Sequence, residues 1–416
     1  VHPVNNLVFT WTYDAVGQRR AMISPGGGRT TYAYRADGRF HWLVNPYSER
    51  TTLSYDAAGR EIQKRLGNGT WSSLTYDAAG QLLQVSDRTS TNTPLTAFTY
   101  TYDAVGNRLT AQQALDGVRL TYTYDATNQL LSEHRTGLDA RHETYTYDPV
   151  GNRLTRQTAA TTVITSAYDA ANRLRYTQST AGRTTYTFDA AGNETLIRPP
   201  TGNRTTSTWT AENQLATMWV PDGRRTTYTY APATCNADEY RVLTRAGEGA
   251  TRHYWDRNNI VRETGFSSTP NAIYTVIPED YGQVVSQRRG SVSSFHHFDG
   301  LGSAAALTNT SETVTDTYQW GAFGTRLSLT GSTVNPYQWI GKLGYHRNAI
   351  TGRYSLRHRD YRDLVARFLS ADPLGFGGGD VNLYRYVANR PLVLVDPSGL
   401  QGYIPHFPPM DIGSGG

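Results

Sequence analysis

The 416-residue chain contains a single cysteine, Cys235, so it can form no internal disulfide bond and no cysteine-based metal site. It also lacks an apolar run of the roughly 20 residues that a membrane-spanning helix requires, and no signal peptide is visible. We therefore expect no membrane span. Because the first residue is valine rather than methionine, we expect the chain to be a fragment of a longer protein.

Lysine and large aliphatic residues are scarce as well. Lys64 and Lys342 are the only lysines, so nearly all basic residues are arginines, and the net charge is +5. The arginines recur along the chain among Asp and Glu residues instead of gathering in one patch, so we expect no nucleic-acid partner. The hydrophobic fraction is 38%, whereas 29 residues are tyrosines, a composition that favours strands built from aromatic and β-branched residues.

A short repeat dominates the first 250 residues. Each unit carries an aromatic residue, usually followed by Asp and a Gly- or Asn-containing turn, as in "YDAVGNR", and the units follow one another at intervals of about 21 residues. The aromatic positions are Tyr13, Tyr34, Tyr55, Tyr76, Tyr102, Tyr124, Tyr147, Tyr168, Phe188, Trp209 and Tyr230. The alternating "LTYTY" before each turn indicates a half-buried strand. These features predict an all-β fold in which antiparallel hairpins stack into a long sheet.

The tyrosine-aspartate repeats resemble the YD repeats of the Rhs family, which includes the C components of bacterial Tc toxins and, more distantly, the teneurins. Two further stretches carry the resemblance. One is "FDGLGSAAALTNTSETVTDTYQWGAFG", which ends at residue 324, and the other is "RFLSADPLGFGGGDVNLYRYVANRPLVLVDPSGL", which ends at residue 400. The second is similar to the Rhs-associated core domain and is the most specific motif of the chain.

The resemblance implies a β-spiral that forms a shell or part of one and ends in a core that folds inward as a plug. On this interpretation residues 1–250 are the YD-repeat spiral and residues 251–344 continue the shell. Residues 345–400 form the core, and residues 401–416 are a short flexible tail, too short and too rich in Pro and Gly to be a toxic domain.

The resemblance also implies a function. Related shells enclose a toxic domain, and their core acts once, as an aspartyl protease on its own chain. The implied partners are the chain's own C-terminal segment or a missing toxin domain, and a secretion-system or toxin-complex subunit. The implied location is secreted or at the cell surface.

The match carries the catalytic roles to Asp360 and Asp372, with Arg359 orienting or polarising the reacting groups. Two carboxylates can hydrolyse a peptide bond when one is ionised and the other protonated. The alternative is structural: Asp360 can pair with Arg357 or Arg362 on a strand surface, and Asp before Pro is common in turns.

By the same match the scissile bond is Leu400–Gln401, inside the segment that begins with Asp396 and Pro397 and includes Gly399. Read alone, this segment is a turn. The chain departs from the family pattern at Asp363, a third carboxylate that competes for a catalytic role, and at Ala366, where relatives carry glycine.

No cofactor and no metal site are expected. His296 and His297 lie beside Asp299, but adjacent strand residues point to opposite faces and would not share an ion. His346 and His358 lie further along the chain. Whether the chain is an enzyme stays open, because a non-catalytic β-repeat scaffold, or a module binding carbohydrate or protein through its aromatic residues, would show the same repeats.

Overall fold

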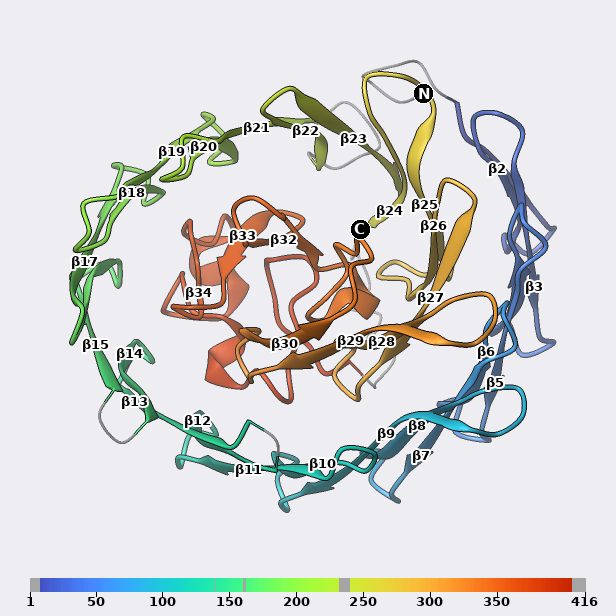
Figure 1. Ribbon diagram of the computed structural model, residues 1–416, viewed down its shortest axis with the longest axis horizontal. Helices are drawn as coiled ribbons and strands as arrows, with labels where there is room; N and C mark the ends of the chain where they lie inside the picture. The colour runs from blue at the N-terminus through green and yellow to red at the C-terminus, as the bar shows by residue number, and fades with distance from the viewer. Residues whose placement is uncertain (1–7, 138, 160–161, 232–239, 406–416) are drawn as a thin grey trace.

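The computed structural model describes residues 8–137, 139–159, 162–231 and 240–405, and it is built almost entirely from strands (Figure 1). Among the described residues, thirty strands form one sheet in which each strand pairs antiparallel with the next along the chain, so the predicted all-β hairpin architecture is confirmed. Cys235 and most of the predicted tail lie outside the described residues. Within them, no helix is both long and apolar enough to cross a bilayer.

The strands of the first circuit of the sheet are β1 (Thr10–Tyr13), β2 (Arg19–Ile23), β3 (Arg29–Tyr34), β4 (Phe40–Val44), β5 (Arg50–Tyr55), β6 (Glu61–Arg65), β7 (Trp71–Tyr76), β8 (Leu82–Arg88), β9 (Pro94–Tyr102), β10 (Arg108–Gln113), β11 (Val118–Tyr124), β12 (Leu130–Thr136), β13 (Arg141–Tyr147), β14 (Arg153–Ala159), β15 (Thr162–Tyr168), β16 (Leu174–Ser179), β17 (Gly182–Phe188), β18 (Glu194–Arg198), β19 (Thr205–Trp209), β20 (Leu215–Trp219), β21 (Arg225–Tyr230) and β22 (Arg241–Ala246).

The same sheet then continues along the chain in eight further strands. These are β23 (Gly249–Asp256), β24 (Asn259–Thr264), β25 (Pro270–Val276), β26 (Val284–Arg289), β27 (Val292–Phe298), β28 (Ala304–Thr308), β29 (Val314–Trp320) and β30 (Arg326–Thr330). A second sheet holds β31 (His346–Arg347), β32 (Tyr354–Leu356), β33 (Arg359–Arg362) and β34 (Arg367–Phe368). Three short 3-10 helices are η1 (Gly341–Leu343), η2 (Gly375–Gly378) and η3 (Val387–Asn389).

The aspartate of the repeat builds the turn. Asp103 Oδ1 accepts the backbone N–H groups of Val105 (3.0 Å) and Asn107 (2.8 Å), while Gly106 has a φ of 87°, a conformation that residues with a side chain rarely adopt. The register shifts between Arg108 and Thr110 of β10, so Leu109 is the extra residue of a bulge next to the turn. Asn128 takes the left-handed position in the next turn, which explains why Gly and Asn alternate there in the sequence.

The aromatic residue ties one hairpin to the preceding one. The Tyr124 hydroxyl donates to the backbone carbonyl of Arg108 at 2.7 Å, and the Tyr102 hydroxyl donates to that of Leu82 at 2.7 Å. Where tryptophan replaces tyrosine, the indole N–H makes the same bond, as in Trp209 to the Glu194 carbonyl at 2.9 Å. The motif therefore favours a ring with a hydrogen-bond donor at its far end, and Phe188 is the exception that lacks one.

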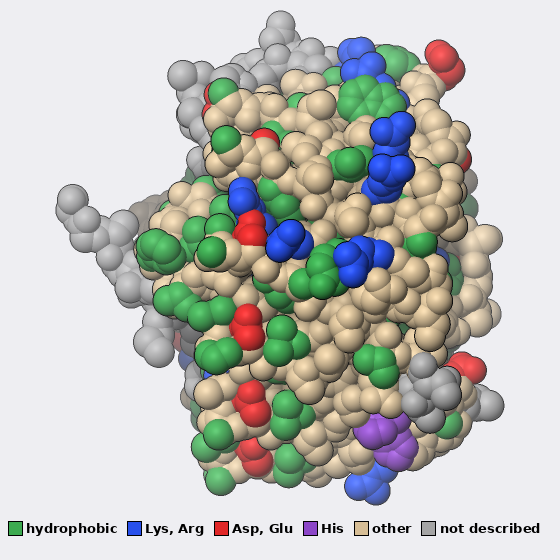
Figure 2. All heavy atoms as spheres, turned by 90° about the vertical axis from the view of Figure 1, so that its left-hand side faces the viewer, with side chains coloured by type: hydrophobic (Ala, Val, Ile, Leu, Met, Phe, Trp, Pro, Cys, Tyr) green, Lys and Arg blue, Asp and Glu red, His purple; other side chains and the backbone are tan. Residues whose placement is uncertain are grey.

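Threonine side chains cover the exposed face of the thirty-stranded sheet, which is called the wall below. Opposite threonine hydroxyls bond across the strands, as Thr101 does with Thr110 at 2.8 Å and Thr146 with Thr155 at 2.7 Å. Figure 2 shows this kind of surface over the left-hand strands of Figure 1, where polar uncharged side chains and backbone predominate and hydrophobic side chains are scattered. The apolar side chains lie mainly on the opposite face of each strand, as the burial pattern of β11 illustrates.

The sheet winds into a spiral whose second circuit lies inside the first (Figure 1). Side-chain contacts join the circuits: Arg19 with Asp256, Asn45 with Thr275 and Lys64 with Gln283 are 237, 230 and 219 residues apart. Further along the spiral the circuit is shorter, because Glu133 contacts Ala322 at a separation of 189 residues.

The segment after β30 fills the interior of this spiral (Figure 1). Its centre is Trp339, whose ring lies 5.2 to 5.5 Å from those of Tyr345, Tyr354, Tyr361 and Tyr386. All five side chains are essentially fully buried, so the aromatic residues supply a core where large aliphatic residues are few.

This inner segment docks on the turns of the repeats. Asn382 Nδ2 donates to Asn152 Oδ1 at 2.7 Å, and the Tyr384 hydroxyl donates to the Gly192 carbonyl at 2.8 Å. Asn389 Nδ2 donates to the Gly151 carbonyl at 2.8 Å. The turn residues thus shape the wall and also bind what lies within it.

Candidate active site

A loop near the end of the described chain is bound at three consecutive carbonyl groups. Residues 357–359 each donate to the backbone oxygen of the residue forty positions later, so the bend formed by residues 397–399 is held against them. The pairs are Arg357 with Pro397 (2.6 Å), His358 with Ser398 (3.1 Å from the backbone N–H and 3.0 Å from Nδ1) and Arg359 with Gly399. The contacts fix the position of the peptide that follows.

Asp396 orders the same loop from within. Its Oδ1 accepts the backbone N–H groups of Gly399 (2.8 Å), Leu400 (3.0 Å) and Gln401 (3.1 Å). The amide nitrogen of the bond predicted to be cut, Leu400–Gln401, therefore points at a carboxylate. Asp396 is 2% exposed, so these hydrogen bonds replace solvent that the carboxylate has lost.

Arg359 joins two carboxylates. Its guanidinium lies 2.8 Å from Asp372 and 3.5 Å from Asp396, and it also donates to the Leu383 carbonyl at 3.1 Å. The group lies over the ring of Phe368 at 3.7 Å. One buried cation thus holds two aspartates beside the loop.

Asp372 has an elevated pKa. Burial raises the pKa of this carboxyl, the positive charge of Arg359 opposes the rise, and the negative charge of Asp396 adds to it. A raised pKa favours the protonated form, which can donate a proton to a carbonyl oxygen.

Asp372 and the Leu400 carbonyl oxygen both lie close to Gly378. A Cβ atom at residue 378 would stand 3.1 Å from Asp372 Oδ2 and 3.4 Å from the Leu400 oxygen. A side chain at this position would therefore crowd both the carboxylate and the carbonyl.

Asp360 has different surroundings. Its carboxylate lies 2.7 Å from Arg241 of β22, in the wall, and its backbone carbonyl accepts the N–H of Leu369. Neighbouring residues on a strand point to opposite faces, so Asp360 and Arg359 diverge from β33. The structure thus gathers Arg359, Asp372 and the loop that contains Leu400, and it sets the Asp360 carboxylate against the wall.

Asp363, the third carboxylate considered from the sequence, belongs to the turn between β33 and β34. Its Oδ1 accepts the N–H of Leu364 at 2.9 Å, and its carbonyl accepts that of Ala366. Ala366 has a φ of 54°, which explains why glycine would suit this position. The sequence did not reveal that Arg357 and His358 bind the loop, because nothing in their spacing indicates which carbonyls they contact.

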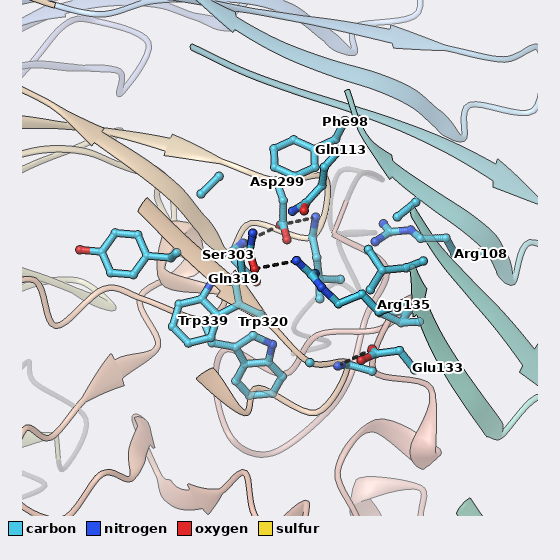
Figure 3. A pocket seen from close by; sticks show the side chains of 18 of the residues that line it. Phe98, Arg108, Gln113, Glu133, Arg135, Asp299, Ser303, Gln319, Trp320 and Trp339 are labelled. Atoms are coloured by element: carbon cyan, nitrogen blue, oxygen red, sulfur yellow. Dashed lines mark hydrogen bonds between the residues drawn. The ribbon is translucent and has the colours of Figure 1, made fainter. Parts of the chain in front are cut away.

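A small cavity lies between the first and second circuits of the sheet (Figure 3). Its volume is about 60 Å³, which suits a few water molecules but is well below the roughly 300–1,000 Å³ of ligand pockets. Arg135 donates to Gln319 at 2.6 Å across it, and Glu133 accepts the backbone N–H of Ala322 at 2.8 Å. These are structural contacts between β12 and the second circuit.

Comparisons with known proteins agree on the architecture. A family model described as the Teneurin YD-shell matches residues 95–264. The chain is similar to the tRNA3(Ser)-specific nuclease WapA of Bacillus spizizenii, with 28% identity over 314 residues, 73% of this chain and 11% of that protein. It is also similar to the double-stranded DNA deaminase toxin A of Burkholderia cenocepacia, with 33% identity over 159 residues, 34% of this chain and 11% of the toxin.

Solved structures show the same fold. The crystal structure of TcdB2-TccC3-TEV superposes with a TM-score of 0.77 at 20% identity, covering 95% of this chain and 21% of that chain. The Photorhabdus luminescens Tc holotoxin pore gives a TM-score of 0.70 at 21% identity with the same coverage. The chain spans about a tenth of these curated relatives and about a fifth of these solved chains.

Proposed function

Because the chain belongs to the Rhs family of YD-repeat proteins, we propose that it contributes wall and plug to a toxin-encapsulating shell and that its core cuts the chain after Leu400. In this proposal residues 1–344 supply the wall and residues 345–400 the core. A secreted or surface location, a toxin-complex or secretion-system partner, and a cargo at or beyond the C-terminal segment belong to the same proposal.

The observation that carries the cleavage proposal is the loop held at residues 397–399. A peptide bond is cut efficiently when it is fixed beside the reacting groups, since the cost of orienting it has been met during folding. The loop is fixed by residues 357–359 and Asp396, and the Leu400 carbonyl and Asp372 both lie beside Gly378.

The reaction is an addition of water followed by loss of the amine. One carboxylate takes a proton from a water molecule while the water oxygen bonds to the Leu400 carbonyl carbon. A protonated carboxyl donates its proton to the carbonyl oxygen. The bond from carbon to the Gln401 nitrogen then breaks, and that nitrogen gains a proton. Asp372, with its raised pKa, suits the acid role, and Arg359 offsets the negative charge that develops.

Two residues compete for the second carboxylate. The family match assigns the role to Asp360, and this assignment stays a prediction. Asp396 is the alternative, because it shares Arg359 with Asp372 and already contacts the Gln401 amide. If Asp396 acts, Asp360 is a positioning residue that anchors β33 to Arg241 in the wall.

The experiment is the intact mass of freshly purified protein across mildly acidic and neutral pH. The wild type should lose residues 401–416 or show them as a separate peptide, and Asp372→Asn should stay whole. Asp360→Asn and Asp396→Asn distinguish the two assignments. Asp222→Asn is the control, because Asp222 is an exposed carboxylate paired with Arg224 at 2.6 Å in the repeat region and should leave cleavage unchanged. A wild type that stays intact at every pH would reject the protease and leave the scaffold role.

A carbohydrate-binding role has less support from the geometry. Sugar sites present aromatic faces in an open groove, whereas the rings of the repeat here direct their donors into the wall. Tyr76, Tyr147 and Tyr230, for example, each donate to a backbone carbonyl of the preceding hairpin at 2.7 to 3.0 Å.

A further inference from the structure

Two histidines and a glutamate converge where the wall meets the inner segment. His253 stands on β23, Glu263 on β24 and His346 on β31, and their ligand atoms all lie within 4.8 Å of one another. His346 is 93 residues from His253 in the sequence, so only the inward turn of the chain brings the three together. The sequence analysis considered His346 but not the pair on the wall.

The distances suit a metal ion. Glu263 Oε1 is 3.2 Å from His253 Nδ1 and 3.1 Å from His346 Nε2. With zinc bonds of about 2.0–2.2 Å, neighbouring ligand atoms of a tetrahedral site lie about 3.3–3.5 Å apart. Two of the three distances between ligand atoms are therefore close to those of such a site. The third, between His253 and His346, would shorten with a modest shift of His346, the least buried of the three side chains.

The surroundings hold the donors in place. His253 Nε2 lies 3.0 Å from the Thr244 hydroxyl, which leaves Nδ1 facing the glutamate. The Tyr274 hydroxyl donates to Glu263 Oε2 at 2.9 Å, and Arg289 lies 3.6 Å from the same oxygen, so Oε1 is the oxygen turned toward the histidines. Supporting contacts of this kind orient ligands in metal sites.

We propose that His253, Glu263 and His346 bind a divalent transition-metal ion of the zinc class, with a fourth position left for another ligand. Imidazole nitrogens and a carboxylate oxygen are donors that zinc accepts. The ion would connect β23 and β24 of the wall to β31 at the start of the inner segment, so it would stabilise docking of the core. The inference does not depend on self-cleavage.

The test adds Zn²⁺, and separately Co²⁺, to chelator-treated protein that comprises residues 1–416. His134 and His142, an exposed cross-strand pair with rings 5.2 Å apart, are first changed to alanine so that they contribute no binding. Titration calorimetry and metal analysis after dialysis should give one ion per chain, and Co²⁺ should give the visible absorption of a tetrahedral site. Affinity should fall as the pH is lowered from neutral, because histidine ligands must be unprotonated.

Three variants in the same background make the site assignment falsifiable. His346→Phe keeps a ring beside Tyr337 but removes a ligand, so it should abolish stoichiometric binding. Glu263→Gln should do the same, and Thr244→Val should weaken binding about 10- to 100-fold while the protein stays folded. Binding that survives His346→Phe would place the ion elsewhere, and a background protein that binds no ion would leave the three residues as a hydrogen-bonded cluster only; either result overturns the proposal.

Discussion

Glu133 shows how strongly one buried carboxylate can destabilise the folded protein. The carboxylate is fully buried on β12; Oε2 accepts the N–H of Ala322, whereas Oε1 has no hydrogen-bond partner among the described residues. Burial raises the pKa of Glu133 to about 7, although the charges of Arg141 and Arg135 and the Ala322 bond act in the opposite direction.

This pKa shift predicts a pH-dependent stability. The folded-state pKa is raised, so the stabilising contribution is full below the ordinary value of 4.5 and is lost as the pH rises through about 7. The loss is on the order of 3 kcal/mol. Glu133→Gln removes the charge and keeps an acceptor for Ala322, so it should raise the thermal midpoint at pH 8 and change it little at pH 5.

Glu143→Gln is the matched control for that measurement. Glu143 is also buried, but its carboxylate accepts the Tyr145 hydroxyl at 2.6 Å and pairs with Arg156 at 2.9 Å. Its substitution should lower the midpoint at both pH values. Equal effects of Glu133→Gln at pH 5 and pH 8 would contradict the assigned pKa.

At the scale of the hairpin, the sequence specified most of what the structure shows. Tyr, Asp and Gly each make a local hydrogen bond or adopt a special backbone conformation in or beside the turn. These roles recur with the repeat, so the sequence pattern predicts them. The DGLGS stretch illustrates this, because Asp299 accepts the N–H groups of Leu301 and Ser303 at 2.9 and 2.8 Å, as the repeat aspartates do. Its resemblance to a turn of the repeat is therefore physical.

The turn can be tested at Asp103. Asp103→Ala removes the acceptor for Val105 and Asn107 and should cost about 1–2 kcal/mol of unfolding free energy. Asp103→Asn should cost less, because Asn309 already forms the same turn and accepts two N–H groups at 2.9 and 3.0 Å. Denaturant unfolding followed by tyrosine and tryptophan fluorescence measures both.

Val105→Ala is the control within the same turn, since this side chain is 67% exposed and makes no contribution to the hydrogen bonds. It should leave the unfolding midpoint nearly unchanged. If Asp103→Ala lowered the unfolding free energy no more than Asp103→Asn, the side-chain acceptor would not be what stabilises the turn.

At the scale of the whole molecule, sequence reasoning reached the spiral only through the family resemblance. Contacts such as Asn382 with Asn152 or His346 with Glu263 join residues 83 or more apart, and no local pattern fixes which turn of the spiral faces which. The candidate site shows the same limit. Its residues were visible in the sequence, but the choice between Asp360 and Asp396 as neighbour of Asp372 depends on which face of β33 meets the wall.

The joining of the two circuits can be tested at Arg19 and Asp256, whose side chains are 4% and 9% exposed and paired in two hydrogen bonds. Arg19→Met leaves a buried, unpaired carboxylate, so it should cost about 3–5 kcal/mol of unfolding free energy, whereas Arg19→Met with Asp256→Leu should recover much of the loss. Arg35→Met, which breaks an exposed pair with Asp37, is the control and should hardly move the midpoint. If Arg19→Met behaved like that control, this pair would not stabilise the contact between the circuits. Apolar packing between the circuits would then be what stabilises it.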